Sequence, residues 1–163
     1  MKRIIFLDVD GVLNHHKTAH RVDPETADDG PGFRGMSPEC VKNLQTLIEK
    51  SGAQVVLSST WRKEPYGLDN TERVARRQGF KGPRWIDITP TLYQGFRELE
   101  RGHEIQAWLD EHLKKDEPSE FIIIDDDSDM VHLLPRLVQT DPYNGGLTEA
   151  KVAEALKLFG IET

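Results

Sequence analysis

Hydrophobic residues are concentrated in short, nearly continuous runs along the chain. The four strongest runs are RIIFLD (3–8), AQVVLSS (53–59), FIIIDD (121–126) and RLVQTD (136–141), and a weaker fifth run is RWIDIT (84–89). Apolar runs without a polar residue at every second position are typical of parallel strands whose sheet is covered on both faces. The pattern therefore predicts a parallel sheet of about five strands.

The segments between these runs show the spacing of amphipathic helices. The clearest are SPECVKNLQTLIEKSG (37–52), EIQAWLDEHLKK (104–115) and TEAKVAEALKLFG (148–160). Ser37 and Thr148 are suitable N-cap residues for the first and last of them. Cys40 and Trp108 lie on the apolar stripes, so we expect both to pack in the core.

Strands that alternate with helices predict a doubly wound α/β fold. The chain of 163 residues suits a single domain, 1–163, with a hydrophobic core of its own. In such folds, ligands bind outside the carboxyl ends of the strands. The residues that follow each apolar run are therefore the first candidates for chemistry.

The composition is that of a globular protein rather than a membrane protein. Apolar residues make up 37% and charged residues 30% of the chain, and no apolar stretch approaches the roughly 18 residues of a membrane span. Cys40 is the only cysteine, which excludes an internal disulfide framework, and no signal peptide is expected at the N-terminus. The expected location is a reducing cytoplasm.

The net charge of −7 argues against broad electrostatic capture of nucleic acid. The charge is unevenly distributed, because residues 60–101 hold nine Lys or Arg and six Asp or Glu, a net of +3 that leaves −10 for the remainder. We interpret this segment either as a solvated helix around RVARRQG (73–79) or as a basic wall that faces an anionic substrate.

Polar and acidic side chains follow three of the apolar runs. The first run leads into Asp8 and Asp10, the second into Ser58, and FIIIDD leads into the acidic cluster DDDSD (125–129). If the strands are parallel, these residues meet at one edge of the sheet. Ionised carboxylates resist burial unless a cation balances them, and Mg²⁺ prefers carboxylate, water and phosphate oxygens. The pattern predicts a Mg²⁺ and phosphate site at this edge.

Three segments resemble motifs of the haloacid dehalogenase (HAD) superfamily. FLDVDGVLN resembles its first motif, VVLSS its second, and FIIIDDDSD its fourth. More narrowly, DVDGVLN, VVLSSTWR, RGHEIQAWL and DDDSD, together with VQTDPYNGGLT, are similar to the HAD domain of "Swiss Army Knife" RNA-repair proteins. The resemblance implies an HAD-like Rossmannoid fold and a Mg²⁺-dependent phosphatase.

The resemblance also implies a role for each motif residue. Asp8 would attack phosphorus and form an aspartyl-phosphate, and Asp10 would protonate the leaving alcohol and later deprotonate the attacking water. Ser58 would hold a phosphoryl oxygen, with Ser59 as the alternative if the register shifts by one residue. Arg101 stands where the family usually has Lys and would bind the phosphoryl group. The alternative for Arg101 is a solvated residue at a helix start.

The expected Mg²⁺ ligands are the carboxylates of Asp8, Asp10, Asp125, Asp126 and Asp129. Asp127 has the poorest claim among the acidic residues and is expected to cap the next turn. Trp61 and Arg62 are candidates to stack on a base and to bind a second phosphate, although Trp61 is equally suited to core packing. Asn14 is a further candidate substrate contact, or a residue that only stabilises the turn.

The substrate follows less directly from the residues. His15 and His16 are expected to be solvated, DPYNGG (141–146) is expected to form a turn, and the short loop 15–36 predicts a minimal cap and an open site. An open site suits a terminal phosphate on an RNA or DNA end, as the resemblance implies. The alternatives are a phosphatase of nucleotides or sugar phosphates and, in another class, a noncatalytic module that binds Mg²⁺ or phosphate.

Overall fold

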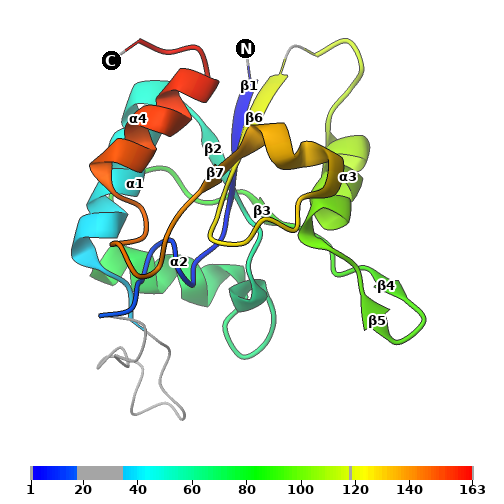
Figure 1. Cartoon of the computed structure of the whole chain (residues 1–163), viewed down its shortest axis with the longest axis horizontal. Helices are drawn as coiled ribbons and strands as arrows, with labels where there is room; N and C mark the ends of the chain where they lie inside the picture. Colours follow the sequence, from blue (N-terminus) through cyan, green and yellow to red (C-terminus); the bar gives the residue numbers. More distant parts are fainter. Residues whose placement is uncertain (1, 18–34, 118, 163) are drawn as a thin grey trace.

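The computed structural model describes residues 2–17, 35–117 and 119–162, and its centre is a five-stranded sheet (Figure 1). The strand order is β3 (Asp87–Ile88), β2 (Gln54–Leu57), β1 (Lys2–Leu7), β6 (Ser119–Asp125) and β7 (Leu137–Gln139). Neighbouring strands are parallel throughout. Each strand falls within or overlaps one of the five predicted runs, so the predicted parallel α/β fold is confirmed.

Helices cover both faces of the sheet, as the doubly wound prediction requires. They are α1 (Pro38–Ser51), α2 (Gly67–Arg77), α3 (Arg101–His112) and α4 (Glu149–Leu158). Successive side chains of a strand point to opposite faces. On β1, Ile5 and Leu7 therefore pack with apolar residues of α1, α2 and α4, whereas Ile4 and Phe6 pack with those of α3.

The helix boundaries follow the local sequence signals. The Ser37 side chain accepts a hydrogen bond from the Cys40 amide at 3.3 Å, and the Thr148 side chain caps α4 in the same way. Cys40 and Trp108 are buried, as predicted. Helix α3 begins at Arg101, three residues before the predicted segment, and this places Arg101 in its first turn.

Three short elements are not predicted by the hydrophobic pattern. They are the 3₁₀ helices η2 (Thr60–Arg62) and η3 (Val131–Arg136) and an antiparallel hairpin of β4 (Tyr93–Gln94) and β5 (Arg97–Glu98). The hairpin lies on the connection from β3 to α3 and projects from the body of the molecule (Figure 1). Phe96 at its turn is fully exposed.

Two further predictions concern membrane-spanning helices and the cap-like loop. None of the helices in the described part of the chain has the length and apolar character needed to cross a membrane. Most of the predicted cap-like loop, 15–36, falls on residues 18–34, which lie outside the described residues.

Candidate active site

The register of the sheet brings the residues that follow three strands to one edge. Leu7 is paired with Leu57 on one side and with Ile124 on the other. The ladder continues one residue further, because the Asp8 amide donates to the Ile124 carbonyl at 3.0 Å and the Ser58 amide donates to the Leu7 carbonyl at 2.8 Å. The backbones of Asp8, Ser58 and Asp125 are therefore held side by side.

Three carboxylates converge at this edge. One oxygen from each of Asp8, Asp125 and Asp126 lies within 4.8 Å of the other two. Asp8 and Asp125 are buried, and Asp126 is half-buried. Three hard oxygen donors at this separation fit a divalent cation such as Mg²⁺. Asp10 and Asp129, the other two expected ligands, are not part of this group.

Burial and crowding shift the pKa of two of these carboxyls. Burial raises the pKa of Asp8 well above its ordinary value, and the negative charges of Asp125 and Asp126 raise it further while Arg101 opposes them. Burial also raises the pKa of Asp125 to about 7, although the Asp127 amide and Arg101 lower it. A bound cation would favour the ionised forms of both carboxyls, because opposite charge lowers a carboxyl pKa.

Arg101 points its guanidinium between the two buried carboxyls. Its Nη1 lies 4.0 Å from Asp8 Oδ1 and 3.9 Å from Asp125 Oδ2, and it donates a hydrogen bond to the Ser58 carbonyl. Close packing sets the position of this helix turn, since a Cβ on Gly102 would lie 2.1 Å from the Met130 carbonyl oxygen. Arg101 is therefore the permanent cation of the site, where a phosphoryl group would need one.

Glu104 is a residue of the site region that the motifs do not single out. Its carboxylate is buried and accepts two hydrogen bonds from Nη2 of Arg62, both at 3.1 Å. It also lies 3.7 Å from Nε of Arg101 and accepts a hydrogen bond from the Leu92 amide at 3.0 Å. Glu104 thus connects Arg62, three residues after the second motif, with Arg101 of α3. The available signal was its position three residues after Arg101, on the same face of the helix.

Asp10 lies on the turn that follows β1, where its side chain is half-buried. Its Oδ1 accepts a hydrogen bond from Asn14 Nδ2 at 2.9 Å, and Asn14 Oδ1 accepts one from the Gly11 amide at 3.0 Å. Gly11 has φ +80, and a Cβ there would lie 2.4 Å from Asp126 Oδ2. Buried Asn14 therefore orients Asp10 and stabilises the turn, which was the second of its two predicted roles.

The two serines of the second motif have different surroundings. Ser58 Oγ is buried and has no hydrogen-bond partner among the described residues. Ser59 Oγ accepts a hydrogen bond from the Trp61 amide at 3.2 Å and caps η2. An unpaired buried hydroxyl beside the carboxylates suits a ligand oxygen. This arrangement favours Ser58, although its phosphate-binding role stays a prediction.

Trp61 and Arg62 lie in the interior rather than at an exposed surface. Trp61 is 1% exposed and stacks on Tyr66, with ring centroids 4.3 Å apart. Arg62 is 6% exposed, and it also donates to the carbonyls of Ser59 and Thr89. The surroundings of Trp61 favour core packing, the alternative given for it. Arg62 also lines a hollow of about 290 Å³, and its binding of a second phosphate stays a prediction.

The other two acidic residues of the DDDSD cluster accept hydrogen bonds from backbone amides. Asp129 Oδ2 accepts a hydrogen bond from the Arg101 amide at 3.3 Å, so it supports the start of α3 rather than the carboxylate group. Asp127 is exposed and accepts one from the Ser128 amide at 2.7 Å, the capping role predicted for it.

Acidic side chains pair with several basic residues of the segment 60–101. The ion pairs within it or at its ends are Arg62–Glu104, Lys63–Glu98, Arg76–Glu72, Arg84–Asp69 and Arg97–Glu100. These pairs divide the positive charge of the segment without removing its net of +3, and a basic wall that faces an anionic substrate stays a prediction.

Comparison with known families places the chain in one of them. Residues 4–152 match the model of the HAD domain in Swiss Army Knife RNA repair proteins. The chain belongs to this family. The motifs that carried the resemblance are thus confirmed at the family level, and membership supports a phosphatase-type activity. No curated protein matches this HAD domain.

Solved structures confirm the architecture of the HAD domain. The HAD domain of effector protein Lem4 from Legionella pneumophila matches with a TM-score of 0.54 and 15% sequence identity, over 96% of this chain and 92% of that one. The structure of an inactive mutant of the same Lem4 domain matches with the same values. At this identity the likeness shows the fold alone.

Proposed function

We propose that this HAD domain is a Mg²⁺-dependent phosphomonoesterase that removes a terminal phosphate from a polynucleotide. The observation that carries the proposal is the meeting of Asp8, Asp125 and Asp126 beside the Arg101 guanidinium. A buried nucleophilic carboxylate, a site for a divalent cation and a permanent positive charge are the groups that phosphoryl transfer requires.

The reaction has two steps that this chain's residues can perform. An Asp8 oxygen attacks phosphorus, the ester P–O bond breaks, and the leaving alkoxide takes a proton from Asp10. Water then attacks the aspartyl-phosphate and gives a proton to Asp10, the bond from phosphorus to Asp8 breaks, and inorganic phosphate leaves. Arg101 and Ser58 hold the phosphoryl oxygens through both steps.

Mg²⁺, when bound, would neutralise charge on the phosphoryl group and on the carboxylates. The residues present fit it, since Asp8, Asp125 and Asp126 offer only hard oxygen donors. Asp8 must be ionised to attack, and its raised pKa means that the crowded carboxyls favour a proton when no cation is bound. Binding of the cation would therefore favour the ionised, nucleophilic form of Asp8.

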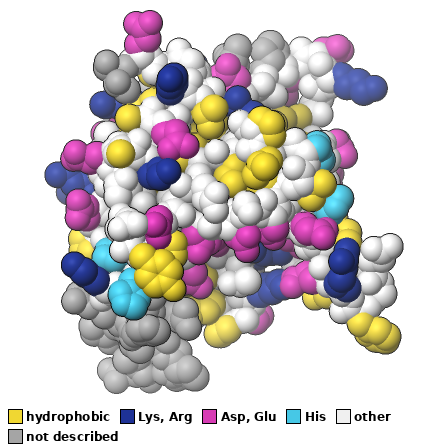
Figure 2. Space-filling view, in the orientation of Figure 1, with side chains coloured by type: hydrophobic (Ala, Val, Ile, Leu, Met, Phe, Trp, Pro, Cys, Tyr) yellow, Lys and Arg dark blue, Asp and Glu magenta, His cyan; other side chains and the backbone are white. Residues whose placement is uncertain are grey.

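A polynucleotide end is the substrate that family membership favours, because the family takes its description from RNA repair proteins. The geometry is compatible with a long substrate. The carboxylates lie at the carboxyl edge of the sheet, and Figure 2 shows a row of acidic side chains exposed across the face of the molecule seen in that view. A phosphatase of nucleotides or sugar phosphates is the alternative within the same chemistry.

The test is phosphate release with Mg²⁺ from a panel of substrates. The panel holds oligonucleotides with a 5′- or 3′-phosphate, mononucleotides, a sugar phosphate and an aryl phosphate. Wild type is compared with Asp8→Asn, Asp10→Asn and, as a matched control, Asp127→Asn. Asp127 belongs to the same acidic run but is exposed and outside the carboxylate group.

Asp8→Asn is expected to abolish turnover and Asp127→Asn to leave it unchanged. With the aryl phosphate, whose phenolate leaves without a proton from Asp10, Asp10→Asn is expected to accumulate the aspartyl-phosphate, which intact-protein mass spectrometry detects after acid quenching. Turnover of small esters alone would move the assignment to metabolite chemistry. No turnover of any substrate, with Mg²⁺ still bound, would favour the noncatalytic binding module.

A further inference from the structure

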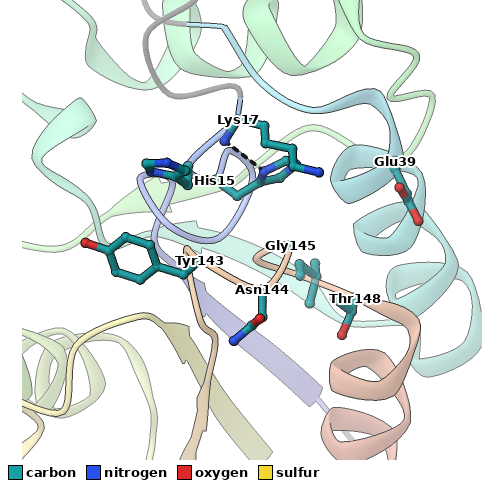
Figure 3. Close-up of a pocket in the computed structure, with 9 residues that line it drawn as sticks. His15, Lys17, Glu39, Tyr143, Asn144, Gly145 and Thr148 are labelled. Atoms are coloured by element: carbon teal, nitrogen blue, oxygen red, sulfur yellow. Dashed lines mark hydrogen bonds between the residues drawn. The ribbon is translucent and has the colours of Figure 1, made fainter.

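A cavity of about 430 Å³ lies beside the turn that carries Asp10. Its lining comes from the loop after β1, the first turn of α1 and the loop between β7 and α4, and includes His15, His16, Lys17, Glu39, Tyr143 and Thr148. Figure 3 shows His15 and Lys17 on one side of the hollow and Thr148 on the other, with Glu39 at its end. The volume lies in the range of small-ligand pockets.

The cavity is joined rigidly to the turn of Asp10. The His16 amide donates to the Pro142 carbonyl at 2.7 Å, and the Leu147 amide donates to the Val12 carbonyl at 2.9 Å. Thr140 Oγ1 donates to the Gly11 carbonyl at 2.7 Å. These bonds fasten the loop after β7 to the loop after β1, so a group bound in the cavity has a fixed relation to the phosphoryl site.

An exposed aromatic ring borders this cavity. Tyr143 is 78% exposed, and its ring centroid lies 5.4 Å from that of His16 at an angle of 38°. Asp141 holds the ring's backbone in place by accepting a hydrogen bond from the Tyr143 amide at 2.9 Å. A ring that is exposed but anchored is suited to stacking on a base, because little conformational freedom is lost on binding.

The charges on the two sides of the active site differ. The cavity beside Asp10 offers Lys17 and two histidines against one acid, Glu39. The hollow of about 290 Å³ on the hairpin side is lined by four acids, Glu98, Glu100, Glu104 and Asp129, against Arg62 and Arg101. With neutral histidines the first side has no net formal charge, whereas the second has a charge of −2, four acids against two arginines. A polyanion that leaves the phosphoryl site is therefore repelled less on the first side than on the second.

We infer that the cavity of His15, His16, Lys17 and Tyr143 binds the nucleotide next to the terminal phosphate of a single-stranded polynucleotide substrate. Its base stacks on Tyr143 and His16, its phosphodiester contacts Lys17, and Glu39 accepts a hydrogen bond from a base amino group or a sugar hydroxyl. This inference rests on the proposed function and states the side on which the strand leaves the site.

The test measures binding and turnover separately. Fluorescence anisotropy gives the Kd of labelled single-stranded oligonucleotides with a 5′- or 3′-phosphate for Asp8→Asn, alone and combined with Tyr143→Ala, Lys17→Gln or Phe96→Ala. Phe96 is the matched control, an exposed aromatic residue on the other side of the site. The same three substitutions in the wild-type background are assayed with an aryl phosphate and with the oligonucleotides.

Tyr143→Ala is expected to weaken oligonucleotide binding about tenfold, the lower range of one base stack. Lys17→Gln should reduce the slope of log Kd against log salt by about 0.7, the value for one phosphate contact on a single strand. Phe96→Ala should change Kd by no more than about twofold. Tyr143→Ala and Lys17→Gln should lower turnover of the oligonucleotides more than turnover of the aryl phosphate, which has no second nucleotide to place in the cavity. Phe96→Ala should change neither.

Two results would overturn the inference, and a third would separate it from the proposed function. Loss of oligonucleotide binding in Phe96→Ala but not in Tyr143→Ala would place the strand on the hairpin side. Turnover of aryl phosphate or a phosphopeptide without oligonucleotide binding would refute it while leaving the phosphatase assignment intact. Oligonucleotide binding that depends on Tyr143, without turnover of any substrate, would support it and refute the proposed function instead.

Discussion

Replacing Glu104 by Leu is expected to destabilise the protein by about 3–5 kcal/mol, because it leaves the buried Arg62 guanidinium without its counter-ion. The side chains of Arg62 and Glu104 are only 2% and 3% exposed, and the two hydrogen bonds between them are 3.1 Å long. Solvent therefore cannot screen the pair or replace the lost partner. Glu104→Gln keeps one acceptor oxygen, so its expected cost is about 1.5–3 kcal/mol, the range for a hydrogen bond to a charged group.

Urea unfolding followed by tryptophan fluorescence measures these costs, and the m-value should stay constant. Replacing both partners, as Arg62→Met with Glu104→Leu, removes both buried charges and should recover much of the loss. A matched control is Glu154→Leu, which breaks an exposed pair with Lys151 and should cost less than about 1 kcal/mol. The reasoning is refuted if Glu104→Leu is as stable as wild type. It is also refuted if the double variant loses as much free energy of unfolding as the two single variants lose together.

Two further predictions concern the carboxylate group and its turn. Without a divalent cation the protein should lose stability as the pH rises from about 4 to about 7, because the pKa of Asp125 is about 7 in the folded state against 3.8 for an ordinary Asp, so the folded state holds the proton more firmly. Mg²⁺ should accordingly raise the Tm more at pH 8 than at pH 5, and equal shifts in thermal melts would contradict this. Gly11→Ala should lower kcat strongly, because it adds a contact with Asp126 at 2.4 Å to the strain of a positive φ. Gly52→Ala is the control in a kinetic assay, since it has a similar φ of +68 but nothing within 4 Å of the added Cβ.

The sheet and the acidic edge could be predicted from the sequence because both depend on short-range patterns. Continuous apolar runs indicate buried parallel strands, and the residue that follows each run must lie at the carboxyl edge. Ser58 directly follows VVL, and the ladder bond from its amide to Leu7 places it at that edge. The position of each residue directly after an apolar run was enough to predict its place at the edge, because parallel strands in register end side by side.

The surroundings of Trp61 and Arg62 could not be predicted in the same way. Both follow the second motif directly, which suggested a contact with substrate. Arg62 is instead held in the interior by Glu104, a residue 42 positions away, and by the carbonyl of Thr89. Pairing over such a separation has no local signature. The hairpin was missed for a related reason, since two strands of two residues each are too short to produce an alternating pattern.

The backbone hydrogen bonds of Asp8 and Ser58, which extend the sheet by one residue, constrain how such a domain can change in evolution. The backbones of the reacting groups share the stability of the innermost strands, whereas the hairpin follows β3, a strand at the edge of the sheet. Substitutions, insertions and deletions in the hairpin therefore alter which molecules reach the phosphoryl site without moving the carboxylates. One chemical centre can in this way be inherited unchanged by enzymes that act on very different substrates.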